Sequence, residues 1–493
     1  MIRPRPTRVA RALRGGLVVG LAALAAAALV LPRQLASRIH DPWSRTLVGA
    51  YYYVWFPENW KLGWLGDRTN PPIEPALGKY SSRDPRVAEQ HIRWATEHGI
   101  DFFVLSWWPQ DPEIERRAQE GFLKARNLGD VKFCMLYESQ GLAFHPGLGT
   151  VNFGGATVEE FLRHFDTIAD RYFSNPSYLR IDGRPVVMLY ITRTYTGLYA
   201  EAVHQLRRRM RKRGFDLFVV GDEIFWKVKR GDTLEADQHE PVSSRVQLFD
   251  AITSYNLYEG EFQQHRGYRG LTRLLADSAR LYERYREAAG SRTVLFPQVL
   301  PGYNDRVMRL AAIDHFPIPR RVRPDAPDGS TLATYIERLA HPFLDPRNPV
   351  VLVTSFNEWN EGSQIEPTSL SPATSRDTSR DGSRYTSGFP YAGYGTAELE
   401  TLRDAFVAVA GTVTSRRDGG APMAGIEVSA WLGAQRVAAT RTTEQGGFTL
   451  SRRWLEPGRT YRIVAQDPHL GASPSRVIDV VSGRTLTRLD FEL

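Results

Sequence analysis

Residues 100–137 read IDFFVLSWWPQDPEIERRAQEGFLKARNLGDVKFCMLY. Two short runs of apolar, β-branched and aromatic residues, at 100–107 and 131–137, predict strands. Between them, residues 113–127 have the apolar spacing of an amphipathic helix. Both runs are apolar throughout rather than alternating, so we expect both faces of their sheet to be covered. The stretch is therefore a β–α–β unit, which predicts parallel strands.

The same alternation continues in both directions along the chain. Further strands are predicted at 47–54, 186–191, 216–221, 250–256, 293–299 and 350–356, and further helices at 84–98, 157–172, 198–213, 270–288, 330–340 and 396–409. Eight such units predict an α/β domain over residues 37–410 with a (β/α)8 TIM-barrel fold. A doubly wound open sheet is the alternative. No Gly-rich phosphate loop follows the first strand, which argues against the commonest use of that alternative fold.

Composition excludes several classes of protein. The chain has 493 residues, of which 42% are hydrophobic, 11% aromatic and 24% charged, which excludes global disorder and collagen-like fibres. Cys134 is the one cysteine, so an intramolecular disulfide is impossible and a cysteine zinc site is disfavoured. The net charge of +8 comes mainly from arginines spread along the chain. Without a clustered basic stripe, we expect no nucleic-acid partner.

The N-terminal residues 1–36 have the pattern of a membrane anchor or a secretory signal. Arginines recur through residues 1–14 without an acidic residue, and an uncharged apolar run follows at 15–32. Small residues fit a cleavage site poorly after this run, so the interpretation is an uncleaved transmembrane anchor. The arginines then predict that the rest of the chain faces the extracytoplasmic side. If the segment is cleaved, the chain is secreted.

Aromatic, carboxylate and amide residues gather where the predicted strands end. The carboxyl ends of barrel strands form the face that carries chemistry. Aromatic rings suit the C–H faces of sugars, and carboxylates and amides suit their hydroxyls, so this face predicts a carbohydrate cleft. The candidate binding residues are Tyr52, Tyr53, Trp55, Trp107, Trp108, Tyr137, Glu138, Asp222, Tyr255, Asn256, Tyr303, Asn357, Trp359 and Gln364.

The last predicted strand leads into a pair of glutamates. Residues 350–368 read VVLVTSFNEWNEGSQIEPT, with Glu358 and Glu361 three positions apart after the strand. On a strand this spacing would direct them to opposite faces, whereas a turn can bring them to the same side. Two carboxyl groups at one pocket are what glycoside hydrolysis requires. A solvated acidic loop, or ion pairs with arginines, is the alternative interpretation.

The block FNEWNEGSQIEP at 356–367 resembles the signature of glycoside hydrolase family 99, the endo-α-1,2-mannosidase and endomannanase family, and is similar to relatives from polysaccharide biosynthesis clusters. Supporting matches are GAYYYVWF at 49–56, GIDFFVLSWWP at 99–109, RIDGRPVVMLY at 180–190, FDAITSYN at 249–256 and FPQVLPGYNDR at 296–306. The sequence departs from the family at Asn360, where His is usual, and after Glu138, where Ser139 and Gln140 replace Pro and Tyr.

The resemblance implies an endo-acting, retaining hydrolase for α-mannosidic or related linkages in a polysaccharide or glycan. It implies that Glu358 is the base on the mannose 2-hydroxyl, which forms a 1,2-anhydro sugar, and that Glu361 is the acid and base at the leaving oxygen and water. The alternatives are a barrel for envelope polysaccharide biosynthesis or trimming, and a non-catalytic glycan-binding protein. No cofactor is expected, and no His/Asp spacing indicates a metal site.

Two further segments differ in composition from the barrel. Residues 364–395 are rich in Ser, Thr, Arg and Asp, which predicts a long loop, either a lid or a disordered insertion. Residues 411–493 contain short apolar runs separated by Gly and Pro, which predicts a seven-stranded β-sandwich. The order of its motifs resembles carboxypeptidase regulatory-like domains, which implies a spacer or a partner surface.

Overall fold

The computed structural model describes residues 46–493 apart from 146–148, 226–242, 256, 258–264, 309–315, 452–454, 456–458, 468–473 and 481–486. The predicted anchor at 1–36 and Asn256 lie outside the described residues. Within the described part, no helix has both the length and the apolar character needed to cross a membrane.

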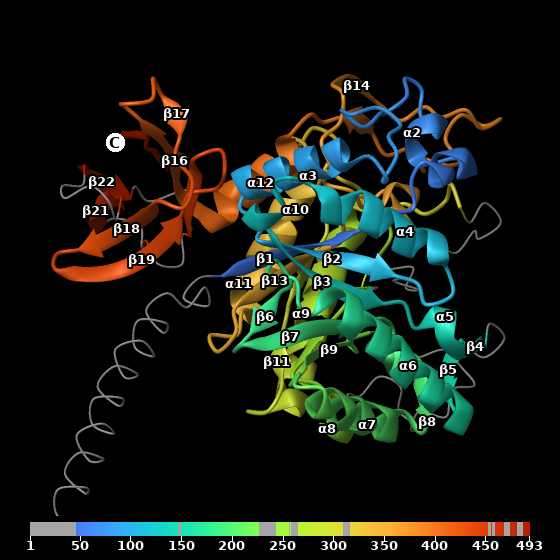
Figure 1. The fold of residues 1–493 in the computed structure, drawn as a ribbon. Coiled ribbons are helices and arrows are strands. Elements are labelled where there is room, and N and C mark those ends of the chain that lie inside the picture. Colours follow the sequence, from blue (N-terminus) through green and yellow to red (C-terminus); the bar gives the residue numbers. More distant parts are fainter. Residues whose placement is uncertain are drawn as a thin grey trace, which may run out of the picture. The chain divides into compact units, whose positions relative to one another are not determined.

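A parallel sheet forms the centre of the larger, mixed α/β part (Figure 1). Its strand order is β11-β10-β9-β7-β3-β2-β1-β13-β12. The strands are β1 (Leu47–Tyr52), β2 (Phe102–Trp107), β3 (Lys132–Tyr137), β7 (Arg184–Leu189), β9 (Phe218–Asp222), β10 (Ala251–Thr253), β11 (Val294–Leu295), β12 (Gln298–Val299) and β13 (Val350–Val353). Each of the eight predicted strands thus has a counterpart.

The two ends of this sheet belong to one stretch of chain. Residues 294–295 pair with β10, whereas 298–299 pair with β13. The sheet is therefore joined end to end through residues 293–299, as in a (β/α)8 barrel. The break falls at Phe296 and Pro297, where Phe296 N–H donates to Ile252 and the Pro297 carbonyl accepts from Leu352.

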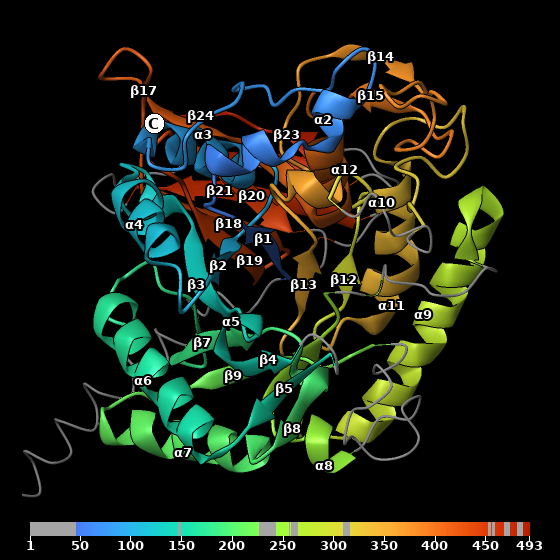
Figure 2. The same ribbon diagram turned by 90° about the vertical axis from the view of Figure 1, so that its right-hand side faces the viewer.

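Helices surround the sheet, as Figure 2 shows. They are α3 (Pro85–Glu97), α4 (Pro112–Glu120), α6 (Gly155–Tyr172), α7 (Tyr199–Lys212), α9 (Gly267–Ala289), α10 (Ser330–Tyr335), α11 (His341–Phe343) and α12 (Ala397–Phe406), with short helices α2 (Leu65–Arg68), α5 (Gln140–Ala143) and α8 (Ser243–Val246). Their apolar stripes face the sheet, which is why its strands are buried on both faces.

The segment predicted as a lid or a disordered insertion has defined partners. Its strands β14 (Ser371–Thr374) and β15 (Tyr391–Gly393) pair with each other. Between them, the Asp377 carboxylate accepts the backbone N–H groups of Tyr385 and Thr386 at 2.8 and 3.0 Å. Tyr385 and Tyr391 then pack in a buried cluster with Trp64 and Trp359. The segment is thereby tied to the loop that carries the two glutamates.

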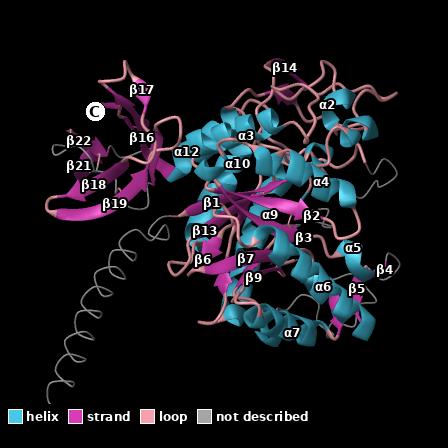
Figure 3. Cartoon of the chain, viewed as in Figure 1, coloured by secondary structure: helices cyan, strands magenta, loops and turns pink. Residues whose placement is uncertain are grey.

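The C-terminal part contains strands and no helix among its described residues (Figure 3). One sheet contains β16 (Val407–Ser415), β17 (Ala421–Pro422), β20 (Gly447–Ser451), β23 (Thr487–Arg488) and β24 (Phe491–Glu492), and the other contains β18 (Glu427–Leu432), β19 (Gln435–Arg441), β21 (Arg459–Gln466) and β22 (Ser475–Val480). Residues from both sheets share one buried core. Its first strand begins at Val407, directly after α12.

Candidate active site

The chain doubles back on itself directly after β13. Ser355 N–H donates to the Ser363 carbonyl at 2.8 Å, and Ile365 N–H donates to the Ser355 carbonyl at 3.0 Å. Between these bonds the backbone makes a 3₁₀ turn over Trp359–Glu361, which ends at Gly362 with φ of 60°. Side chains three apart in a 3₁₀ turn lie one above the other. The turn therefore brings the carboxyl groups of Glu358 and Glu361 to the same side, which is one of the two arrangements that their spacing allows.

Glu358 is the more enclosed of the two glutamates, with 2% of its surface exposed. Its Oε1 accepts the Asn360 backbone N–H at 3.0 Å, and its own N–H donates to Ser355 Oγ at 2.8 Å. Burial raises the pKa of Glu358 well above its usual value, and the negative charge of Glu361 raises it further. The pair therefore holds a proton more readily than two isolated glutamates.

Glu361 is half-buried and is held by a tyrosine that follows β10. The Tyr255 hydroxyl donates to Glu361 Oε2 at 3.0 Å and lies 2.6 Å from the hydroxyl of Tyr53. Tyr255 is fixed in turn by its backbone N–H, which donates to Asp222 Oδ1 at 2.8 Å. A chain of hydroxyl groups thus links the ends of β1 and β10 to one carboxylate of the pair.

Glu138, after β3, is a third buried carboxyl group at this face. Ser106 Oγ donates to its Oε1 at 2.6 Å, and Trp108 Nε1 donates to the same Ser106 Oγ at 3.0 Å. Burial raises the pKa of Glu138 to about 8, and the charges of Glu361 and Asp222 add to this shift. At neutral pH Glu138 is therefore largely protonated and can donate a hydrogen bond to a ligand.

Asp222 is occupied within the protein. Its carboxylate accepts the backbone N–H groups of Ile191 and Tyr255 and pairs with Arg193 at 3.0 Å. Although these partners favour the charged form, burial is the larger effect and raises the pKa of Asp222. The side chain fixes the loop after β7 and the position of Tyr255, so its placement is that of a support for the cleft.

Trp107 and Tyr137 contact the helices that pack outside the sheet. Trp107 Nε1 donates to Glu115 in α4 at 2.7 Å, and the Tyr137 hydroxyl lies 2.9 Å from His164 Nδ1 in α6. Successive strand residues point to opposite faces, so Ser106 and Glu138 turn inward where these two aromatics turn outward. The structure therefore separates Trp107 and Tyr137 from the other candidate residues.

Three more of the candidates surround a buried carboxylate that the sequence did not single out, Glu366. Its oxygens accept from Trp359 Nε1 and the Tyr80 hydroxyl, both at 2.8 Å, and Oε1 lies 3.1 Å from His91 Nε2. Tyr52 reaches this group through His91 Nδ1 at 2.9 Å, and Asn357 Nδ2 reaches it through the Tyr80 hydroxyl at 3.3 Å. Tyr52, Asn357 and Trp359 thus belong to the hydrogen-bond network of Glu366, which supports the loop at 357–366 (the glutamate loop).

Three further candidates, Trp55, Tyr303 and Gln364, are among the described residues. Trp55 is half-buried and stacks on Tyr53 with ring centroids 4.5 Å apart, which provides an aromatic face. Tyr303 is buried and immediately precedes Asn304, whose N–H donates to the Glu361 carbonyl at 2.5 Å. Gln364 is buried in the loop after Gly362, where its backbone carbonyl accepts from Arg320. Asn256 lies outside the described residues.

Tyr190 belongs with this group but is absent from the predicted set. Its ring meets Tyr255 edge-on at 5.4 Å, and the charges of Glu138 and Glu361 add to burial in raising its pKa. The rule that found the other aromatics would have found this one, because Tyr190 also follows a buried strand. The assembled residues offer aromatic rings, two adjacent carboxyl groups and a third carboxyl group with a raised pKa, an arrangement suited to acid–base chemistry on a sugar.

No group of three or more His, Cys, Asp or Glu able to hold a metal occurs among the described residues.

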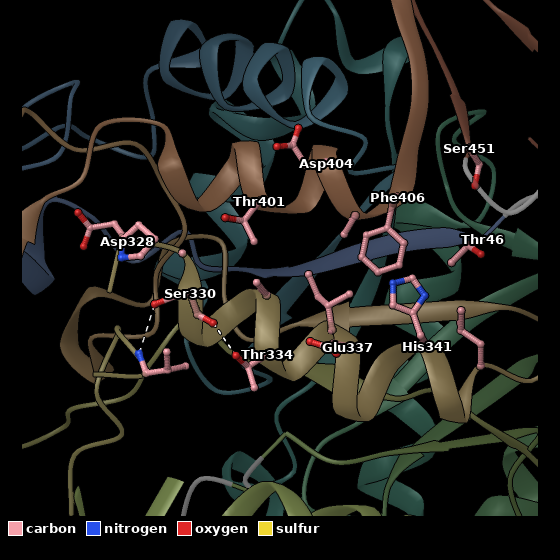
Figure 4. Close-up of a pocket in the computed structure, with 17 residues that line it drawn as sticks. Thr46, Asp328, Ser330, Thr334, Glu337, His341, Thr401, Asp404, Phe406 and Ser451 are labelled. Carbon is pink, nitrogen blue, oxygen red and sulfur yellow. Dashed lines mark hydrogen bonds between the residues drawn. The ribbon is translucent and has the colours of Figure 1, made fainter. Parts of the chain in front are cut away.

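A cavity of about 880 Å³ lies away from the candidate residues, between α10, α11 and α12 (Figure 4). It is lined by Thr46, just before β1, and by Glu337, His341 and Phe406. It therefore adjoins the opposite ends of the strands and includes none of the candidate residues.

Curated proteins with known names are similar to part of this chain. A human protein named glycoprotein endo-alpha-1,2-mannosidase-like is 26% identical over 61% of this chain and 59% of its own length. The rat glycoprotein endo-alpha-1,2-mannosidase is 23% identical over 65% of this chain and 67% of its own length. The chain thus spans less than two thirds of the human relative.

A solved structure named glycoside hydrolase-like protein has a TM-score of 0.52 and 20% identity, and it covers 73% of this chain and 94% of its own. This likeness supports the barrel fold. The model of the family described as Glycosyltransferase WbsX matches residues 66–373, which include β2 through β13 and both glutamates. With more than half of its length matched, the chain belongs to the Glycosyltransferase WbsX family.

Proposed function

We propose that this chain is an endo-acting, retaining glycoside hydrolase that cleaves α-mannosidic or related linkages in a polysaccharide or glycan. The observation that carries the proposal is the turn at 358–361, where two adjacent carboxyl groups lie beside the tyrosines that follow β1 and β10. The named activities of the human and rat relatives favour α-mannosides. The proposed roles are Glu358 as base on the sugar 2-hydroxyl and Glu361 as acid at the glycosidic oxygen.

The reactive form of the pair has Glu358 ionised and its single proton on Glu361. In the first step, Glu358 takes the proton of the 2-hydroxyl, and that oxygen attacks the anomeric carbon. The bond from the anomeric carbon to the glycosidic oxygen breaks, and Glu361 gives its proton to the departing oxygen. The product is a 1,2-anhydro sugar. The burial that raises the pKa of Glu358 also increases its proton affinity, which suits the removal of a weakly acidic proton.

In the second step, Glu361 takes a proton from water as the water oxygen attacks the anomeric carbon. The bond between that carbon and the 2-oxygen breaks, and Glu358 returns its proton to the 2-oxygen. Two inversions at one carbon give net retention. The Tyr255 hydroxyl, 3.0 Å from Glu361 Oε2, stabilises the ionised acid between the two steps.

The test compares Glu361→Gln and Glu358→Gln on a natural α-mannan and on an α-mannosyl fluoride. Fluoride needs no proton to leave, so Glu361→Gln should lose mannan cleavage by about 10²–10⁴-fold and keep much of the first step on the fluoride. Glu358→Gln should be inactive on both substrates. The exposed Glu159→Gln is the control and should match the wild type.

Two results would overturn the proposal. A 2-fluoro donor lacks the internal nucleophile and should be inert. A covalent sugar found on Glu358 by mass spectrometry would instead establish a double displacement. Near-normal rates for both Gln variants on every substrate would remove the pair from the site.

The description of the matched family favours a second candidate, glycosyl transfer at the same site. If a sugar hydroxyl replaces water in the second step, the 1,2-anhydro intermediate yields a new glycoside. Product analysis with and without an added mannoside acceptor separates the two functions. Longer products that form at the expense of free sugar would identify a transferase.

A further inference from the structure

A buried arginine holds the chain that follows Glu361. Arg320 is 5% exposed, and its Nη1 donates to the Gly362 carbonyl at 2.9 Å. Its Nη2 donates to the Gln364 carbonyl at 2.8 Å. Two carbonyl groups within three residues of Glu361 are thus held by one side chain, which arrives from a different part of the barrel.

Helix α12 and the strand before it complete the arrangement. Arg320 Nη2 also donates to Glu398 Oε1, in the first turn of α12, at 3.0 Å, and the Glu398 side chain is fully buried. The guanidinium lies over the Tyr394 ring at 4.6 Å. The Tyr394 hydroxyl donates to the carbonyls of Gln364 at 3.1 Å and Glu366 at 2.7 Å. Alternate carbonyls at 362, 364 and 366 are therefore all bonded.

We propose that Arg320 and Tyr394 are positioning residues that fix the carboxyl group of Glu361 for proton transfer to the leaving oxygen. The inference rests on the proposed function and adds to it the part of the protein that sets the acid in place. Gly362 has a left-handed conformation and directly follows Glu361. A shift of residues 362–366, which Arg320 and Tyr394 hold, would therefore also move the Glu361 carboxyl group. A displacement of about 1 Å in an active site can cost ~10²-fold in rate.

The arginine fork is essential to this role. A planar guanidinium can bond two carbonyls and a carboxylate at fixed angles, whereas a lysine ammonium is a point charge on a flexible stem. Arg320→Lys therefore keeps the buried positive charge beside Glu398 but loses the geometry. Tyr394→Phe keeps the ring under Arg320 and removes only the hydroxyl bonds to Gln364 and Glu366.

The experiment measures kcat and KM for the full chain on an α-mannan and an α-mannosyl fluoride. For Arg320→Lys, kcat on the mannan should fall by about 10²-fold, with KM nearly unchanged. The rate of fluoride release in the first turnover should stay within a few-fold, because fluoride leaves without a proton from Glu361 and Glu361 acts on that substrate only in the later attack by water. Tyr394→Phe should show the same pattern with a smaller loss. The control is Arg321→Lys, since Arg321 bonds Asp328 and not the loop.

Equal loss on both substrates, or no loss in either variant, would overturn the proposal. Amide hydrogen exchange over 357–366 gives a second measurement that does not need turnover. Exchange there should rise in Arg320→Lys while the rest of the barrel keeps its wild-type rates. If the wild type turns over no donor, the proposed function fails. Unchanged amide exchange over 357–366 in Arg320→Lys would separately show that Arg320 does not hold the loop in place.

Discussion

Glu138 is a carboxyl group whose ionisation opposes folding. Its pKa is raised to about 8 by burial, so between about pH 4.5 and 8 the folded chain binds a proton that the unfolded chain has released. Stability therefore falls as pH rises through that window, by about 1.4 kcal/mol for each pKa unit that separates the two states. Glu138→Gln should raise the melting temperature relative to the wild type at pH 9, and much less at pH 5.

The measurement is thermal unfolding of both proteins at pH 5 and pH 9. The exposed Glu159→Gln, again the control, should give the same difference from the wild type at both values. If the effect of Glu138→Gln did not depend on pH, Glu138 would have the same pKa in the folded and the unfolded chain.

Some residues of the site can be placed from the sequence pattern of a single strand or turn, and others cannot. Ser106, Trp107, Glu138 and Tyr137 follow the alternation of a strand, which already indicates that neighbours face opposite sides. The prediction that every aromatic residue at a strand end binds the ligand did not take this alternation into account. In the structure, Trp107 and Tyr137 contact α4 and α6 instead. The spacing of Glu358 and Glu361 allowed either opposite faces or the same side, and the turn at 359–361 gives the second arrangement.

At the scale of elements, two helices begin with the same two residues. Asp84 precedes Pro85 at the start of α3, and Asp111 precedes Pro112 at the start of α4. The Asp111 side chain accepts the N–H groups of Glu113 at 2.9 Å and Ile114 at 3.4 Å, which would otherwise lack helical partners.

Asp111→Ala should lower the free energy of unfolding by about 1 kcal/mol, because it removes this cap. Urea denaturation at pH 7 measures the change. Asp325→Ala is the control, since Asp325 is exposed and bonds Arg323 outside any helix. An equal effect at both positions would exclude a specific capping role.

The strands were predictable as elements because each is a continuous apolar run, and the caps place several helices to within a few residues. The contacts that brace the glutamate loop were not. Arg320 lies 42 residues before Gly362 in the chain, and His91 lies 275 residues before Glu366. One sequence contains no local pattern that would bring such distant positions together, because only the packed barrel does so.

At the scale of the molecule, the C-terminal strands carry none of the candidate residues. Their contacts with the barrel include Glu444 N–H, which donates to Asp130 Oδ1 at 3.0 Å. Ending the chain after Phe406 should therefore leave turnover of a small soluble substrate within a few-fold of the full chain. Circular dichroism must show an intact barrel in the shortened protein. A large loss with the barrel folded would give the C-terminal part a role in the cleft.

We propose that residues 1–36 anchor the chain in a membrane with the barrel on the extracytoplasmic side, because a basic stretch precedes the apolar run. The full chain should stay with membranes after a carbonate wash and keep its N-terminal residues in mass spectrometry. A soluble product that starts near residue 29 or 37 would instead show a cleaved signal.

The divided strand at 293–299 also has a consequence for the motions of the barrel. Its pairings with β10 and β13 each involve two residue pairs, fewer than at any other join in the barrel. Parts of a fold that are held by few contacts open locally at a lower free energy than the rest. Gln298 sits at this join and donates to the Tyr255 carbonyl at 3.1 Å, and Tyr255 in turn bonds Glu361. Tyr255 thus connects this short join to Glu361, so we expect a local opening between residues 293 and 299 to displace the carboxyl group as well.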